Sequence, residues 1–354
     1  MAEPNTFNTV TSTPFNNIRA IPLDLTKQLL QETGYVPDGE TGYGKFLLEY
    51  QTQSLFPRCI REHSGPSASP DKDHTPASRA IAHLKENVIK TGYYVSTALN
   101  YQRFQSLRNS HIIPSGVKML VYIPSPLSIA SAFHESGYLS DIASIYKKGL
   151  LQDMEDLSAY TTEQTGHDHI AIQIDIGGEL PLASSPSRHS QVFKKLDMMK
   201  TILEMICEIN PSIEVGLHFA LDQLDTSITT SLLETSIATV LHVLHNAPNR
   251  IKWLKFPLTG TGSVNVWKEL SRNYEIISAL KKQNVQLRFT QAHPEQAQLA
   301  VDRLERCGFE LLRGKLQIEK KIVDLTGEHV QFCLQSMQQY ESEKTHALNN
   351  HGLS

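Results

Sequence analysis

The stretch HIAIQIDIGGE, residues 169–179, decides the fold class. Its isoleucines alternate with Ala171, Gln173 and Asp175, and it ends at a pair of glycines, which is the pattern of a short strand followed by a loop. A segment with apolar residues at helical spacing precedes it at 140–160, and another follows at 192–209. Strand and helix therefore alternate around this stretch, which indicates parallel strands connected by helices.

The same alternation extends along most of the chain. We expect further strands at 117–126, 213–219, 251–257 and 285–290, and further helices at 230–247 and 294–308. Each strand carries polar residues two positions apart, so each has one polar face. An open sheet covered by helices on both sides tends to be apolar on both faces. A closed barrel, in contrast, can hold polar groups at its mouth.

We therefore predict an α/β protein with a (β/α)8 TIM barrel. The barrel is expected to form one domain over residues 1–340, with a polar loop at 62–78 and a polar C-terminal tail at 341–354. The loop is rich in Pro, Ser and charge and has no apolar periodicity, so we expect it to be mobile.

Composition limits the function classes. The chain has 33 Lys+Arg against 37 Asp+Glu and no concentrated basic run, which argues against nucleic acid or an anionic membrane as partner. Its four cysteines form no CxxC pair, its first residues lack the features of a signal peptide, and no apolar stretch approaches the length of a membrane span. We predict a cytoplasmic protein that acts on a small molecule; the sequence leaves the oligomeric state open.

The strand ends carry the candidate catalytic residues. In a barrel the carboxyl ends of the strands surround the active site, and Asp175, Glu179, His218 and Lys255 lie at or just beyond such ends. His218 and Lys255 are suited to proton transfer or anion binding, and Gly216 would leave room for a ligand beside His218. The alternatives are a capping role for Asp175, a core histidine and a surface lysine.

Further residues are candidates for substrate binding. The acids of VPDGETG, residues 36–42, flank a glycine, although turn formation alone explains that motif. A histidine follows the strand at 285–290, where an ordinary loop residue is the alternative. We predict no metal and no cofactor, because HExxH, Walker A and GxSxG are absent and GTGSVN at 260–265 lacks the third glycine of a dinucleotide motif. The predicted substrate-binding residues are Asp38, Glu40, Tyr94, Gln173, Trp253 and His293.

Several segments together resemble one known family. VPDGETG, TGYYVSTALNYQRFQSLRN at 91–109, VKMLVYIPSPLSI at 117–129, IAIQIDIGGE and VGLHF are similar to the TIM-barrel proteins related to cobalamin-independent methionine synthase and uroporphyrinogen decarboxylase. The resemblance runs in order from Phe7 to Lys315. It implies a barrel with a pocket at the carboxyl ends of its strands.

The resemblance also bears on chemistry. The methionine synthase branch holds a catalytic zinc with His, two Cys and Glu, but here its His-x-Cys step corresponds to His218-Phe219-Ala220, and the later cysteine is missing around residues 311–319. The decarboxylase branch works without metal or organic cofactor. We therefore expect a metal-free enzyme for cyclisation, rearrangement, dehydration or decarboxylation in specialised metabolism. A zinc- or folate-dependent methyltransferase and an inactive binding barrel are the alternatives.

Overall fold

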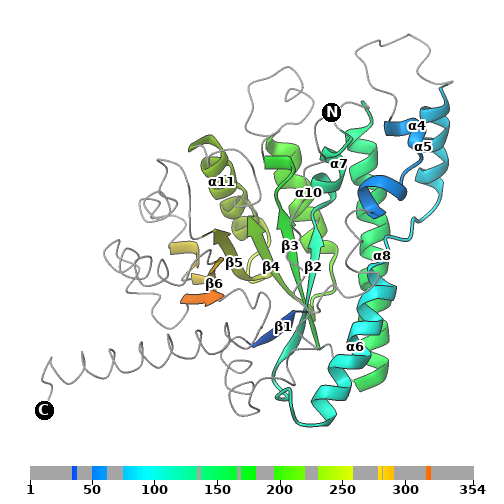
Figure 1. Ribbon diagram of the computed structural model, residues 1–354. Helices are drawn as coiled ribbons and strands as arrows, with labels where there is room; N and C mark the ends of the chain where they lie inside the picture. The colour runs from blue at the N-terminus through cyan, green and yellow to red at the C-terminus, as the bar shows by residue number, and fades with distance from the viewer. Residues whose placement is uncertain are drawn as a thin grey trace, which may run out of the picture.

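Seven parallel strands form a single sheet (Figure 1). The computed structural model describes residues 34–37, 50–61, 75–133, 137–165, 169–180, 195–219, 230–257, 278–280, 282–290 and 316–319. The order of the strands in the sheet is their order in the chain. They are β1 (Tyr35–Pro37), β2 (Lys118–Pro124), β3 (Ile170–Ile176), β4 (Glu214–Phe219), β5 (Ile251–Pro257), β6 (Gln286–Thr290) and β7 (Leu316–Glu319).

Within the described residues, helices connect consecutive strands from β1 to β5. The long helix α8 (Leu139–Thr165) lies beside α6 (Tyr93–Asn109) and leads into β3, while α10 (Lys195–Glu208) and α11 (Thr230–Asn246) lead into β4 and β5 (Figure 1). These four helices contribute buried residues to one large apolar cluster. The shorter helical elements are the π-helix η3 (Tyr50–Ser54), α4 (Arg58–Arg61), α5 (Pro76–Glu86) and α7 (Pro126–Ser131).

The two faces of the sheet differ in composition. On one face, alternate residues such as Val121, Ile174 and Leu217 pack with the helices in the large cluster. The other face carries a separate small apolar cluster of Leu120, Ala171 and Trp253, together with the polar residues of the strands. The helices therefore cover one face of the sheet, and the prediction that each strand has one polar face is confirmed for β3, β4 and β5.

The polar face is strongly concave. The rings of Tyr35 on β1 and Trp253 on β5 have centroids 4.9 Å apart. In a flat sheet two strands separated by three others would lie about 19 Å apart, since neighbouring strands are about 4.8 Å apart. The sheet is therefore curled into a half-barrel, which brings side chains from distant strands together on its inner face.

The predicted (β/α)8 barrel is wrong, although the α/β class is confirmed. Strands β1 and β7 lie at opposite edges of the sheet, and within the described ranges no strand closes the gap between them. A barrel and a sheet covered by helices on both faces were the two alternatives that the sequence pattern left. Within the described residues the sheet is open and the helices pack on one face, and this arrangement produces the same alternation of polar and apolar residues.

The expected polar loop ends earlier than predicted. The Thr75 hydroxyl accepts a hydrogen bond from the Ser78 N–H at 3.0 Å, and Pro76 occupies the first turn of α5. Thr-Pro is thus a helix start at this point, because an N-cap followed by proline satisfies the first turn. Residues 62–74 and 341–354 lie outside the described part of the chain.

Among the helices that the structure describes, none is both long and apolar enough to cross a membrane.

Candidate functional site

Three titratable side chains lie in one row near the carboxyl ends of the central strands. Asp175 on β3 is in register with His218 on β4, which is in register with Lys255 on β5. Residues in register on parallel strands project to the same face, so all three belong to the concave face. His218 and Lys255 are buried, with exposed fractions of 6% and 7%.

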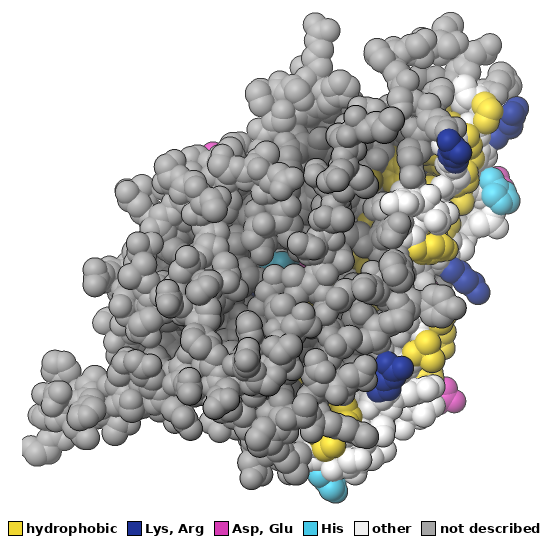
Figure 2. Space-filling model, in the orientation of Figure 1, with side chains coloured by type: hydrophobic (Ala, Val, Ile, Leu, Met, Phe, Trp, Pro, Cys, Tyr) yellow, Lys and Arg dark blue, Asp and Glu magenta, His cyan; other side chains and the backbone are white. Residues whose placement is uncertain are grey.

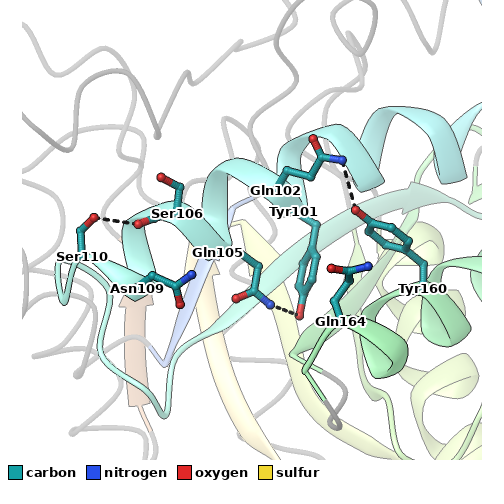
Figure 3. A pocket seen from close by; sticks show the side chains of 8 residues that line it. All are labelled: Tyr101, Gln102, Gln105, Ser106, Asn109, Ser110, Tyr160 and Gln164. Carbon is teal, nitrogen blue, oxygen red and sulfur yellow. Dashed lines mark hydrogen bonds between the residues drawn. The ribbon is translucent and has the colours of Figure 1, made fainter.

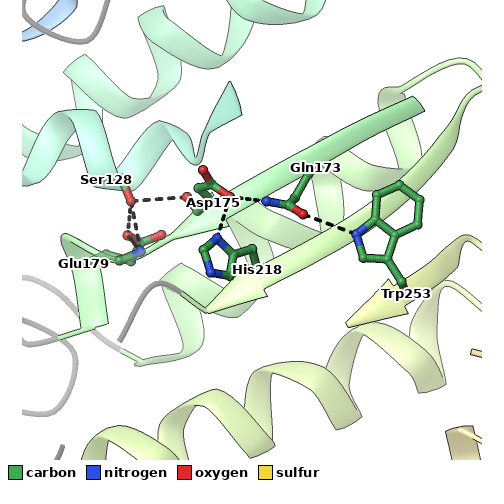
Figure 4. A network of polar contacts seen from close by, with 7 residues as sticks. Ser128, Gln173, Asp175, Glu179, His218 and Trp253 are labelled. Atoms are coloured by element: carbon green, nitrogen blue, oxygen red, sulfur yellow. Dashed lines mark hydrogen bonds and ion pairs between the residues drawn. The ribbon is translucent and has the colours of Figure 1, made fainter. Parts of the chain in front are cut away.

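The two ring nitrogens of His218 have different environments. Its Nδ1 lies 2.9 Å from Asp175 Oδ1 (Figure 4). Its Nε2 is buried and has no hydrogen-bond partner among the residues that the structure describes. A buried polar atom without a partner costs about 1–3 kcal/mol, and such an atom is a natural contact point for a ligand.

Asp175 is linked in turn to Gln173 and Trp253. Gln173 Nε2 donates to Asp175 Oδ1 at 2.9 Å, and the Trp253 indole N–H donates to Gln173 Oε1 at 3.4 Å (Figure 4). Trp253, Gln173, Asp175 and His218 therefore form a continuous chain of contacts across β5, β3 and β4. We call these four residues the polar relay.

Gly216 makes room for the polar relay, which corrects the expectation that it makes room for a ligand. A Cβ atom at position 216 would lie 1.9 Å from Cε2 of Trp253. The indole therefore occupies the space that the missing side chain leaves. Because Gly216 precedes His218 on the same face, the indole fills the concave face on the amino-terminal side of the imidazole.

Lys255 brings a positive charge to the same face. Its Nζ lies 5.8 Å from the centre of the Tyr122 ring, a cation–π distance. Tyr122 is on β2 and Lys255 is on β5, so the lysine side chain extends across the concave face. Tyr122 was not among the predicted residues, although it is in register with Gln173 and therefore lies on the same face of the sheet.

Glu179 has a different environment from the one predicted. It is fully buried, and it accepts hydrogen bonds from the hydroxyls of Ser125 and Ser128 and, at 3.1 Å, from the Gly177 N–H. Burial raises the pKa of Glu179, and these donors offset only part of the effect. Ser125 also caps α7, so Glu179 joins the loop after β3 to that helix. The sequence signal for this arrangement was the Ser-Pro pair at the end of β2.

A second charged cluster lies at the opposite end of the concave face. Glu214 accepts a hydrogen bond from the Tyr35 hydroxyl at 2.6 Å and forms an ion pair with Lys118 at 3.1 Å. Burial alone would raise the pKa of Glu214, but the Tyr35 hydrogen bond and the charges of Lys118 and Lys252 together lower it below its usual value. These contacts satisfy the carboxylate, so the cluster stabilises the amino end of the half-barrel.

The described part of the outer surface includes two shallow depressions. One of about 450 Å³ lies between α6 and α8 and is lined by uncharged side chains such as Tyr101, Gln105 and Tyr160 (Figure 3). Another of about 540 Å³ lies beside the end of α11, near His245 and Lys282. Figure 2 shows cationic and hydrophobic side chains interspersed along the described surface over α5, α6 and α8. Neither depression contains a predicted site residue.

The structure brings together some of the predicted residues and not others. The polar relay unites four of them, with Lys255 beside it. Tyr94 lies instead in the helical layer, where its ring meets that of Tyr160 edge-on at 6.3 Å. Within the described residues no group of three or more His, Cys, Asp or Glu side chains is arranged to hold a metal. Three predicted residues lie outside the described residues: Asp38, Glu40 and His293.

Comparison with known proteins assigns no family. No family model matches the sequence, no curated protein matches it, and no solved structure matches the fold. The geometry around His218 is therefore the basis on which a function can be proposed.

Proposed function

We propose that this protein is a metal-free and cofactor-free enzyme in which His218 transfers a proton to or from a small organic molecule. The observation that carries this proposal is the His218 ring, whose Nε2 is buried without a partner among the described residues while Nδ1 contacts Asp175 at 2.9 Å. A buried imidazole oriented by a carboxylate is a common general acid–base arrangement.

The neighbouring residues support this chemistry. Asp175 orients the ring and stabilises the imidazolium that forms when Nε2 takes up a proton. Lys255 adds a positive charge to the same face, where it would stabilise an enolate or alkoxide produced by that proton transfer. General acid–base catalysis of this kind contributes about 10²- to 10⁴-fold to a rate. Cyclisation, rearrangement, dehydration and decarboxylation are all reactions that it can serve.

The wider setting belongs to the same proposal. We propose a cytoplasmic enzyme of specialised metabolism whose partner is its small-molecule substrate. The resemblance to the methionine synthase and uroporphyrinogen decarboxylase group supports this reading through its metal-free branch. Ala220 supports it as well, because it stands where the zinc-binding branch has a cysteine.

The test compares His218→Gln with the matched control His83→Gln, since His83 is exposed on α5. Each protein is incubated with a pool of small metabolites, and untargeted mass spectrometry records which compounds are consumed. We expect the unaltered protein and His83→Gln to consume the same compound, and His218→Gln to do so at least about tenfold more slowly at a similar melting temperature. Equal consumption by His218→Gln would refute the proposed role.

A further inference from the structure

Each contact in the polar relay has a fixed polarity, by which we mean that it is fixed which atom donates the hydrogen and which atom accepts it. An indole N–H can only donate a hydrogen bond. The Gln173 atom that faces Trp253 at 3.4 Å must therefore be the amide oxygen, which leaves the amide nitrogen facing Asp175 Oδ1 at 2.9 Å. Trp253 thus determines which way round the Gln173 amide lies.

That polarity continues to His218. Asp175 Oδ1 already accepts from Gln173, and an ionised carboxylate has no hydrogen to give. His218 Nδ1, 2.9 Å from the same oxygen, must then carry a hydrogen and donate it. A neutral imidazole has only one such hydrogen, so Nε2 carries a lone pair.

We propose that Asp175 holds neutral His218 in the tautomer with hydrogen on Nδ1, and that Trp253 and Gln173 keep an accepting atom turned toward His218 at position 175. Nε2 is then an acceptor, and the ligand of this site presents a hydroxyl or N–H group to it. Trp253 and Gln173 are positioning residues, since they act on the ligand only through His218. This inference rests on the proposed function for the role of Nε2, but the tautomer can be measured without a substrate.

Burial makes the polarity persistent. Trp253 and Gln173 are 0% and 1% exposed, so water does not replace a lost contact between them. Reversing the Gln173 amide would place its N–H₂ group against the indole N–H, donor against donor. Gly216 is needed for the same arrangement, because only a residue without Cβ lets the Trp253 indole lie at this place.

The decisive variant is Asp175→Asn, in which an amide replaces the carboxylate. An Asn side chain can offer His218 either an oxygen or an N–H₂ group. If the donor–acceptor order set by Trp253 and Gln173 extends to position 175, the Gln173 N–H holds the Asn oxygen in place and His218 keeps its hydrogen on Nδ1. If it does not, the Asn amide is free to turn, and hydrogen on Nε2 becomes a major form.

The full-length protein is labelled with ¹⁵N-histidine, and two-bond ¹H–¹⁵N spectra are recorded at mildly alkaline pH. The chain has 15 histidines, and the signal that His218→Gln removes identifies His218. We expect the Nδ1–H form in the unaltered protein and in Asp175→Asn. In Asp175→Asn combined with Trp253→Phe, we expect the ratio of Nε2–H to Nδ1–H to rise at least about fivefold, as the loss of one buried hydrogen bond allows.

Gln173→Met in the Asp175→Asn background is the second route, because it interrupts the polar relay while the indole stays in place. It should give the same rise in the Nε2–H form, and near-ultraviolet circular dichroism checks that each variant is folded. An Nε2–H form in the unaltered protein or in Asp175→Asn alone would overturn the inference, and so would an unchanged tautomer in both double variants. Failure of the proposed function would appear differently, as full turnover by His218→Gln.

Discussion

Trp253 lies directly against Gly216, its register partner on the neighbouring strand. The tryptophan is completely buried, and the glycine supplies the space for its ring. The middle of the concave face is therefore filled by a pair in which one residue is very large and the other has no side chain. Both the shape of this face and the position of the polar relay depend on the pair.

We predict that Gly216→Ala destabilises the protein. The added Cβ would lie 1.9 Å from the Trp253 ring, so the ring has to move within a packed face. Overpacking of this kind costs about 1–3 kcal/mol or more. The free energy of unfolding is measured by urea denaturation, with Gly116→Ala as control, because nothing lies within 4 Å of a Cβ at that position. Equal stability of the two variants would show that the indole moves at little cost.

The contribution of Glu179 to the stability of the protein should fall as the pH rises. Burial raises its pKa in the folded state above the usual 4.5. The folded protein therefore holds this proton more tightly than the unfolded chain, and the contribution to stability is lost as the pH rises from about 4.5 through the folded pKa. We expect Glu179→Gln, which does not ionise, to become more stable relative to the unaltered protein over this range. A constant difference in unfolding free energy between the two proteins would contradict the raised pKa.

Glu214 should show the opposite dependence. Despite its burial, Tyr35 and Lys118 lower its folded pKa below the usual value of 4.5. Its contribution is therefore present above pH 4.5 and is lost as the pH falls through the folded pKa. We expect Glu214→Gln to be less stable than the unaltered protein at neutral pH and to approach it in acid. Urea denaturation across the acid range measures this difference, and a gap that widens in acid would refute the assignment.

Asp153 should be important for the stability of the first turn of α6. The N-cap residue Gly92 has no side chain, and Asp153 on α8 accepts hydrogen bonds from Tyr93 N–H and the Thr91 hydroxyl instead. Loss of a helix cap costs about 0.5–2 kcal/mol, so we expect Asp153→Ala to lower the melting temperature. Asp156→Ala removes an exposed carboxylate from the same helix and is the control. Similar melting temperatures for the two variants would mean that the first turn does not need this cap.

The local pattern of polar and apolar residues in the sequence predicted the central strands well. The strand expected at 251–257 is β5 itself, and β2, β3 and β4 lie within their predicted ranges. The shared polar face of Gln173 and Asp175 followed from the two-residue period of a strand. The same local information placed His218 on that face, next to Asp175 in register.

What the sequence could not supply was the relation between distant residues. The closure of the sheet depends on whether its two edge strands meet, and no local period reports that. The role of Gly216 depended on the residue that faces it from another strand, Trp253. The partners of Glu179 lie about 50 positions earlier in the chain, at the start of a short helix.

The curl of the sheet also has a consequence for the order in which the protein folds. Every strand pairs with a neighbour in the chain, so the sheet can grow unit by unit. The bond from Tyr35 to Glu214 instead joins residues 179 positions apart, and closing so long a loop is entropically unfavourable until the intervening units have formed. We therefore expect the concave face to form late. Pulse-labelling hydrogen exchange would show this as slow protection of β1 relative to β3, and His218 would acquire its surroundings only near the end of folding.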